Sequence, residues 1–158
     1  MVTGVRLFRL YAVVVLLLGA TVPSSAQPIR DRILADVRVV EQAECAIVRV
    51  ILKFPVKYVS HFPLDSGDEL RIALRPIDVP AADRNALIKR ESMRAPSSER
   101  AAIEQIVYEG DSVAGPIVTL FFRHAVFFKV GQGNDFRSLI IAISGTAPSD
   151  TCRPESAR

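Results

Sequence analysis

One stretch of the chain returns later in the sequence, and this repeat restricts the possible folds more than any other feature. The stretch covers residues 47–59, IVRVILKFPVKYV, and it returns at residues 117–129 as IVTLFFRHAVFFK. Val56 therefore corresponds to Val126, 70 positions later. Short apolar runs with period-two alternation predict β-strands. We expect an all-β chain built from two copies of one unit.

Each copy is predicted to hold four strands. They cover residues 37–40, 47–54, 56–62 and 70–74 in the first copy, and residues 106–108, 117–124, 126–130 and 139–143 in the second. A break follows the second strand, at Pro55 in the first copy, where the missing N–H interrupts a ladder, and at Ala125 in the second. Four short strands cannot bury an apolar face alone. The copies should therefore pack as a β-sandwich of two related four-stranded halves with a pseudo-two-fold axis, or form one curled sheet with internal pseudosymmetry.

The domain organisation follows from the repeats and from the composition between them. We expect a signal peptide, a linker, one β domain made of two half-repeats and a connector, and a tail. These segments cover residues 1–26, 27–32, 33–144 (half-repeats 33–77 and 102–144, connector 78–101) and 145–158. The connector has weak helical character and should hold a turn or two of helix. The formation of a helix this short depends more on packing than on propensity.

The first residues are typical of a secretory signal peptide. Arg6 and Arg9 precede an apolar core over residues 11–18, and small residues follow up to Ala26. The apolar core is much shorter than the roughly 20 residues that a membrane span needs. We therefore expect export with cleavage after Ala26, rather than an uncleaved anchor, and no membrane span in the mature chain.

The charge of the mature chain argues against a nucleic-acid partner. Residues 1–26 contain two arginines and no acid, so their removal lowers the formal net charge from +3 to +1. The sequence also contains no cluster of Lys and Arg interleaved with aromatic residues. A nucleic-acid-binding chain normally has a strongly positive net charge and such a cluster of basic residues.

Cys45 and Cys152 are the only cysteines. An even number of cysteines in an exported chain favours a disulfide, which here would tie the tail to the first half-repeat. A zinc site that also uses His61 and His124 is formally possible, but the four residues lack the paired short loops of such sites. We expect the Cys45–Cys152 disulfide, and neither a metal nor another cofactor.

No catalytic constellation is recognisable, so we do not expect an enzyme. The sequence has no Gly-x-Ser-x-Gly elbow and no His-Glu-x-x-His motif. The Gly131-Gln132-Gly133 segment predicts a hairpin turn rather than a phosphate loop, because no helix follows it. His124 is interpreted as a packing residue at a strand end, and His61 as a solvated residue beside a loop.

Basic residues on strands, or at their ends, form the candidate ligand-binding surface. They are Arg49, Lys53, Lys57, Arg71, Arg75, Arg123, Lys129 and Arg137, with Phe121, Phe127 and Phe136 as candidate apolar contacts. One interpretation is a solvated outer face, as on most sheets. The other is a sheet surface that binds an anionic or carbohydrate polymer, since exposed phenylalanines would need a partner.

The order of these segments resembles the AMIN domain. The resemblance rests on three segments of the first copy, on the corresponding segments of the second copy and on the signal peptide. The three segments are Val-Arg-Val-Val (37–40), Ile-Val-Arg-Val-Ile-Leu-Lys-Phe-Pro-Val-Lys-Tyr (47–58) and Asp-Glu-Leu-Arg-Ile-Ala-Leu (68–74). It covers residues 33–144. The family's fourth strand usually carries Asp before its last Leu, where this chain has Ala73 and Ala142.

The resemblance implies a periplasmic β-sandwich that binds peptidoglycan or places an attached protein in the cell envelope. The expected function is thus a non-catalytic envelope module, with peptidoglycan or an envelope protein as its partner. The alternative is a protein-interaction scaffold whose exposed strand edge extends the sheet of a partner in an envelope complex.

Overall fold

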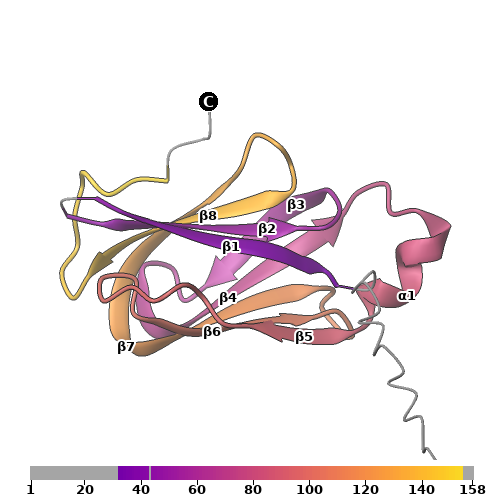
Figure 1. Ribbon diagram of the computed structural model, residues 1–158, viewed down its shortest axis with the longest axis horizontal. Helices are drawn as coiled ribbons and strands as arrows, with labels where there is room; N and C mark the ends of the chain where they lie inside the picture. Colours follow the sequence, from indigo (N-terminus) through magenta and orange to yellow (C-terminus); the bar gives the residue numbers. More distant parts are fainter. Residues whose placement is uncertain (1–31, 43, 155–158) are drawn as a thin grey trace, which may run out of the picture.

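The computed structural model describes residues 32–42 and 44–154 (Figure 1). The predicted signal peptide, most of the predicted linker and the last four residues of the predicted tail lie outside the described residues. The elements are β1 (Leu34–Glu41), β2 (Ala46–Leu52), β3 (Val56–Phe62), β4 (Ser66–Pro76), the 3-10 turn η1 (Ala81–Asp83), α1 (Arg84–Leu87), β5 (Arg90–Met93), β6 (Ile103–Glu109), β7 (Ile117–Gln132) and β8 (Ser138–Gly145). The all-β prediction is confirmed. In the described part of the chain, neither helical segment is long and apolar enough to cross a membrane.

The strands form one antiparallel sheet that folds over on itself. The strand order is β1-β2-β8-β7-β4-β3, and β5 and β6 join this path through β7. The first part of β7 pairs with β4 and β6, whereas its last residues pair with β8. Figure 1 shows β1, β2 and β8 as one layer and β4, β5 and β6 as another, with β7 bending from the second layer into the first.

Period-two alternation places the core between the two layers. In β2, every second residue is buried, including Val48 and Val50, while Arg49 between them points to the opposite face. Leu70 and Leu120 of the other layer belong to the same apolar cluster. Each such side chain contributes about 1.5–3 kcal/mol when it is fully buried, so this shared core holds the layers together.

The two copies of the repeat exchange strands. The second strand of each copy pairs with the fourth strand of the other copy, because β2 pairs with β8 and β7 pairs with β4. The registers match pair by pair: Val48 lies opposite Ile141 as Val118 lies opposite Ile72, and Arg49 lies opposite Ile140 as Thr119 lies opposite Arg71. The β1–β2 and β6–β7 ladders match as well, each with a bulge at the equivalent position. We call this correspondence the register relation.

The register relation supports the predicted duplication. Of the two arrangements expected from the sequence, the described strands form one continuous sheet with internal pseudosymmetry. A sandwich of two separate halves is not confirmed, because each layer draws strands from both copies.

Several predicted element boundaries were wrong. β7 runs through Ala125 without a break, because alanine, unlike Pro55, keeps its backbone donor. His124 consequently lies within a strand and is exposed, instead of packing at a strand end. The connector contains the strand β5 besides a short helix, and β4 already begins at Ser66, inside the loop predicted before it.

Candidate functional site

The eight basic residues predicted as a binding surface lie on two faces and in turns. Arg49 and Lys129 lie on the outer face of the β1–β2–β8 layer, Lys57, Arg71 and Arg75 on the outer face of β3 and β4, and Lys53, Arg123 and Arg137 in turns or at the bend of β7. Lys57 and Arg75 are cross-strand neighbours. The structure therefore does not bring the whole set together on one face.

Most of these basic side chains form ion pairs within the chain. The pairs are Arg49 with Asp135 (2.9 Å), Lys53 with Asp83 (2.7 Å), Arg71 with Glu69, Arg123 with Glu99 (3.6 Å) and Lys129 with Asp150 (3.9 Å). Ion pairs this exposed contribute about 0–1 kcal/mol each to stability. Their main effect is to neutralise the positive charge locally. Lys57, Arg75 and Arg137 form no ion pair with another described residue.

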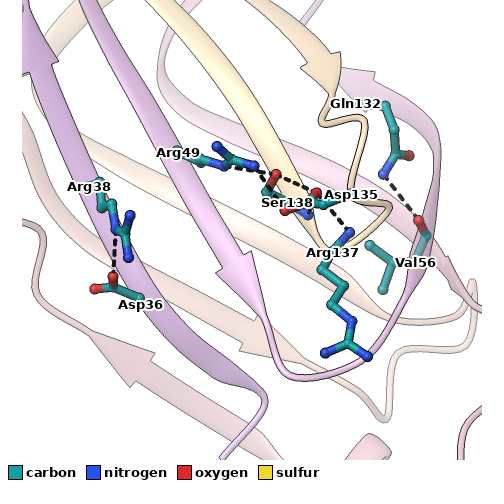
Figure 2. A network of polar contacts seen from close by, with 8 residues as sticks. All are labelled: Asp36, Arg38, Arg49, Val56, Gln132, Asp135, Arg137 and Ser138. Atoms are coloured by element: carbon teal, nitrogen blue, oxygen red, sulfur yellow. Dashed lines mark hydrogen bonds and ion pairs between the residues drawn. The ribbon is translucent and has the colours of Figure 1, made fainter. Parts of the chain in front are cut away.

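Arg49 stabilises the turn between β7 and β8 (Figure 2). Its Nε donates to Ser138 Oγ at 3.0 Å and its Nη2 to Asp135 Oδ2 at 2.9 Å. Asp135 Oδ1 also accepts hydrogen bonds from the Ser138 hydroxyl and from the N–H groups of Arg137 and Ser138. Burial raises the pKa of Asp135, but these bonds lower it further than burial raises it. The Arg49 side chain thus bonds to the turn and stabilises the fold.

A groove lies on the outer face of the hairpin formed by β3 and β4. Phe62 is 74% exposed and lies directly opposite Arg71 in the ladder. Two hollows adjoin this pair. One, of about 420 Å³, is lined by Phe62, Pro63, Gly67, Asp68, Glu69 and Arg71; the other, of about 140 Å³, is lined by Ser60, His61, Phe62, Arg71, Ala73 and Ile117. Because both hollows share Phe62 and Arg71, we treat them as one site, the Phe62–Arg71 groove.

Glu69 holds Arg71 in place within the groove. Its carboxylate accepts a hydrogen bond from Arg71 Nε, and this bond raises the pKa of Arg71 above its ordinary value. The terminal Nη atoms of Arg71 meet no hydrogen-bond acceptor among the described residues, and neither does Asp68 meet a donor there. The groove thus offers a guanidinium group and a carboxylate beside an aromatic ring.

A bulge in β3 determines which side chains face the groove. The register shifts between Tyr58 and Ser60, so Val59 is the extra residue. His61 therefore turns toward the core side, where it contacts the Tyr58 hydroxyl (2.5 Å), the Leu64 carbonyl oxygen (2.9 Å) and the Phe128 ring. Phe62 turns outward. The interpretation of His61 as a solvated residue was wrong, because it is half-buried and bonded at both ring nitrogens.

The arrangement is suited to binding. Ser60 and His61 both line the smaller hollow, but both nitrogens of His61 are already engaged, so His61 has no nitrogen left to activate the Ser60 hydroxyl. In the described ranges, no three His, Cys, Asp or Glu side chains gather as possible metal ligands. Stacking on Phe62 and charge pairing with Arg71 are the interactions that the groove can offer.

The predicted aromatic contacts lie elsewhere. Phe121 is half-buried opposite Glu69, Phe136 is exposed in the turn before β8, and Phe127 lines a separate pocket of about 360 Å³ beside the tail. Sequence reasoning missed Phe62. Simple alternation from Val56 places Phe62 on the buried side, and only the bulge at Val59 turns it outward.

The two cysteines lie side by side. Cys45, just before β2, and Cys152, in the tail, are buried and pack together with Ala142. Burial, and next the hydrogen bond with Cys45, raise the pKa of the Cys152 thiol to about 12. Both are thiols in this structure, so the disulfide stays a prediction.

Comparisons with known proteins identify no relative. No model of a known protein family matches the chain, and no curated protein or solved structure matches it either. The resemblance to the AMIN domain therefore stays a hypothesis based on the sequence pattern.

Proposed function

We propose that the protein is a non-catalytic module of the periplasm that binds peptidoglycan through the Phe62–Arg71 groove. The observation that carries this proposal is the exposed Phe62 ring opposite Arg71, with a hollow on either side. A large apolar side chain this exposed at a hollow is typical of a binding site. The predicted signal peptide and the resemblance to AMIN domains support peptidoglycan as the ligand and the cell envelope as the location.

The alternative, strand-edge augmentation, is less well supported because side chains bond to backbone groups of two edge strands, β1 and β3. The Glu91 carboxylate accepts the N–H groups of Ile33 and Leu34 at 2.5 and 3.1 Å, at the start of β1. On β3, the Gln132 amide accepts the Tyr58 N–H at 2.6 Å and donates to the Val56 carbonyl oxygen at 3.1 Å (Figure 2). Side chains and bulges at an edge discourage pairing with another strand.

Co-sedimentation with purified cell-wall sacculi tests the proposal. The mature chain should sediment with sacculi at moderate salt, and Phe62→Ala or Arg71→Ala should weaken this retention. Loss of a charge-assisted hydrogen bond costs about 1.5–3 kcal/mol, which corresponds to about a tenfold to hundredfold weaker affinity.

Arg38→Ala is the matched control. Arg38 and Arg71 are similarly exposed, at 67% and 63%, and each pairs with an acid two positions before it, Asp36 or Glu69. Arg38 lies on the other layer, so its loss should leave retention unchanged. Equal retention of all variants, or no retention of the wild-type chain, would contradict the proposal.

A further inference from the structure

The chain itself shows what can occupy a surface equivalent to the Phe62–Arg71 groove. Beyond β8, the tail returns across the outer face of the β1–β2–β8 layer. Cys152 packs against Ala142 and Ile47, and Pro154 lies over Gly131, where an added Cβ would be 3.1 Å from the proline ring. Ala142 and Ile140 are only 1% and 4% exposed. An irregular segment of the tail thus covers Ala142, Ile47 and Gly131, and we call these three residues the seat of the tail.

Hydrogen bonds hold the tail in its seat. Lys129 Nζ donates to the Ser149 carbonyl oxygen at 3.1 Å, and the Ser144 hydroxyl donates to the Ala147 carbonyl oxygen at 2.8 Å. The Thr151 hydroxyl donates to the Glu44 carboxylate at 3.0 Å. The tail therefore has a defined path across the sheet.

The register relation maps the seat of the tail onto the groove. The three residues of the seat, and Ile140 opposite Gly131, have counterparts in the other copy, because they occupy the same places in matching ladders. Ala142, Ile47, Gly131 and Ile140 correspond to Ala73, Ile117, Phe62 and Arg71. All four counterparts line the smaller hollow of the groove. The groove is thus the open counterpart of a surface that the chain's own tail covers.

Two substitutions between the copies indicate how the ligand of the groove differs from the tail. Ala73 and Ile117 keep the small apolar floor on which, in the other copy, the Cys152 side chain packs. Arg71 stands where the other copy has Ile140, and it adds a guanidinium group with unoccupied donors. A carboxylate is the natural partner of these donors. Phe62 stands where the seat has Gly131, and it adds an apolar wall.

We infer that the Phe62–Arg71 groove binds a short peptide that carries a small side chain and a carboxylate. In peptidoglycan, the peptide stems have this chemistry, whereas the glycan strand has no peptide backbone. The inference rests on the proposed function and specifies it further: the module recognises the stems rather than the sugars. The methyl group of an alanine would lie over Ala73 and Ile117, and a neighbouring carboxylate would bind Arg71.

Competition with the two components of the wall tests this inference. An amidase that cleaves stems from glycan yields soluble stem peptides and stem-free glycan strands, which are then separated. Each is added to the mature chain bound to intact sacculi. Stem peptides should release the protein, and glycan strands at the same concentration should not. Release by glycan alone overturns the inference and leaves the proposed function standing, whereas failure to bind intact sacculi overturns the proposed function itself.

Arg71→Ile provides the sharper variant. It recreates the apolar surface of the other copy, keeps the shape of the strand and removes the charge. The concentration of stem peptide at half-maximal binding should be at least tenfold higher for this variant than for the wild-type chain. Fluorescence titration with labelled stem peptides measures it. Arg38→Gln, on the other layer, should bind like the wild-type chain. Equal binding of the stems by Arg71→Ile and by the wild-type chain would overturn the inference.

Discussion

At the scale of single residues, the turn before β8 shows how neighbouring atoms restrict one position. A Cβ atom at Gly133 would lie 2.1 Å from Ser138 Oγ and 2.9 Å from Asp135 Oδ1. Both atoms belong to the network that Arg49 completes, so neither can move without breaking hydrogen bonds. Glycine at this position is therefore a steric requirement rather than a preference of the turn.

Gly133→Ala should destabilise the fold. We expect a loss of about 1–3 kcal/mol, because the added methyl group overpacks a closed network. Urea unfolding of the variant and the wild-type chain measures the difference. In a Ser138→Ala background the closest atom is absent, so the same change should cost less. An equal cost in both backgrounds would contradict the steric explanation.

The sequence predicted part of this turn. Gly131-Gln132-Gly133 indicated a hairpin turn, and a turn does join β7 to β8, but Gly131 and Gln132 still belong to β7. The role of Arg49 could not be predicted, because its partners lie 86 and 89 positions away. The alternation of β2 showed only that Arg49 faces outward, which is equally true of a ligand-binding residue.

At the scale of elements, the bulge at Val59 explains why the candidate site was missed. The counterpart ladder between β7 and β8 has no extra residue there, because Lys129 lies opposite Ala142 as Ser60 lies opposite Ala73. A period-two pattern contains no signal for a bulge, so simple alternation from Val56 would place His61 and Phe62 on the wrong faces.

Deletion of Val59 should leave the fold and the groove intact. The shortened β3 would match its counterpart in β7, so we expect stability to change by about 1 kcal/mol or less. Deletion of Ala73 is the control, because it shifts part of β4 by one position and turns Leu74 away from the core. Circular dichroism during urea unfolding distinguishes the two. A loss of structure on deletion of Val59 would contradict its description as an unpaired extra residue.

At the scale of the whole molecule, the repeat predicted two related copies but not the exchange of strands between them. Local alternation decides which residues form a strand, whereas the choice of partner depends on contacts between distant segments. The pairing of β2 with β8 is such a contact. Because β7 continues through Ala125, it can bend from one layer into the other and join them into one sheet.

The contact between Cys45 and Cys152 joins the tail to the first half-repeat. Cys45 and Cys152 are 107 positions apart, and the chain-entropy model assigns about 4–5 kcal/mol to a disulfide that closes a loop of this size. Oxidation should therefore raise the free energy of unfolding of the mature chain. Urea unfolding before and after oxidation measures the gain, and Cys152→Ser should show none.

The rate of oxidation should depend on how accessible and how ionised the thiols are. A pKa of about 12 leaves Cys152 almost entirely protonated near neutral pH, and the thiolate is the species that attacks a disulfide. Glutathione disulfide should therefore oxidise the folded chain slowly, faster as the pH rises toward that pKa, and much faster in urea, where burial no longer raises the pKa. Thiol counting over time measures these rates. Rapid oxidation of the folded chain at neutral pH would contradict the buried pair, and two thiols that never join would refute the disulfide.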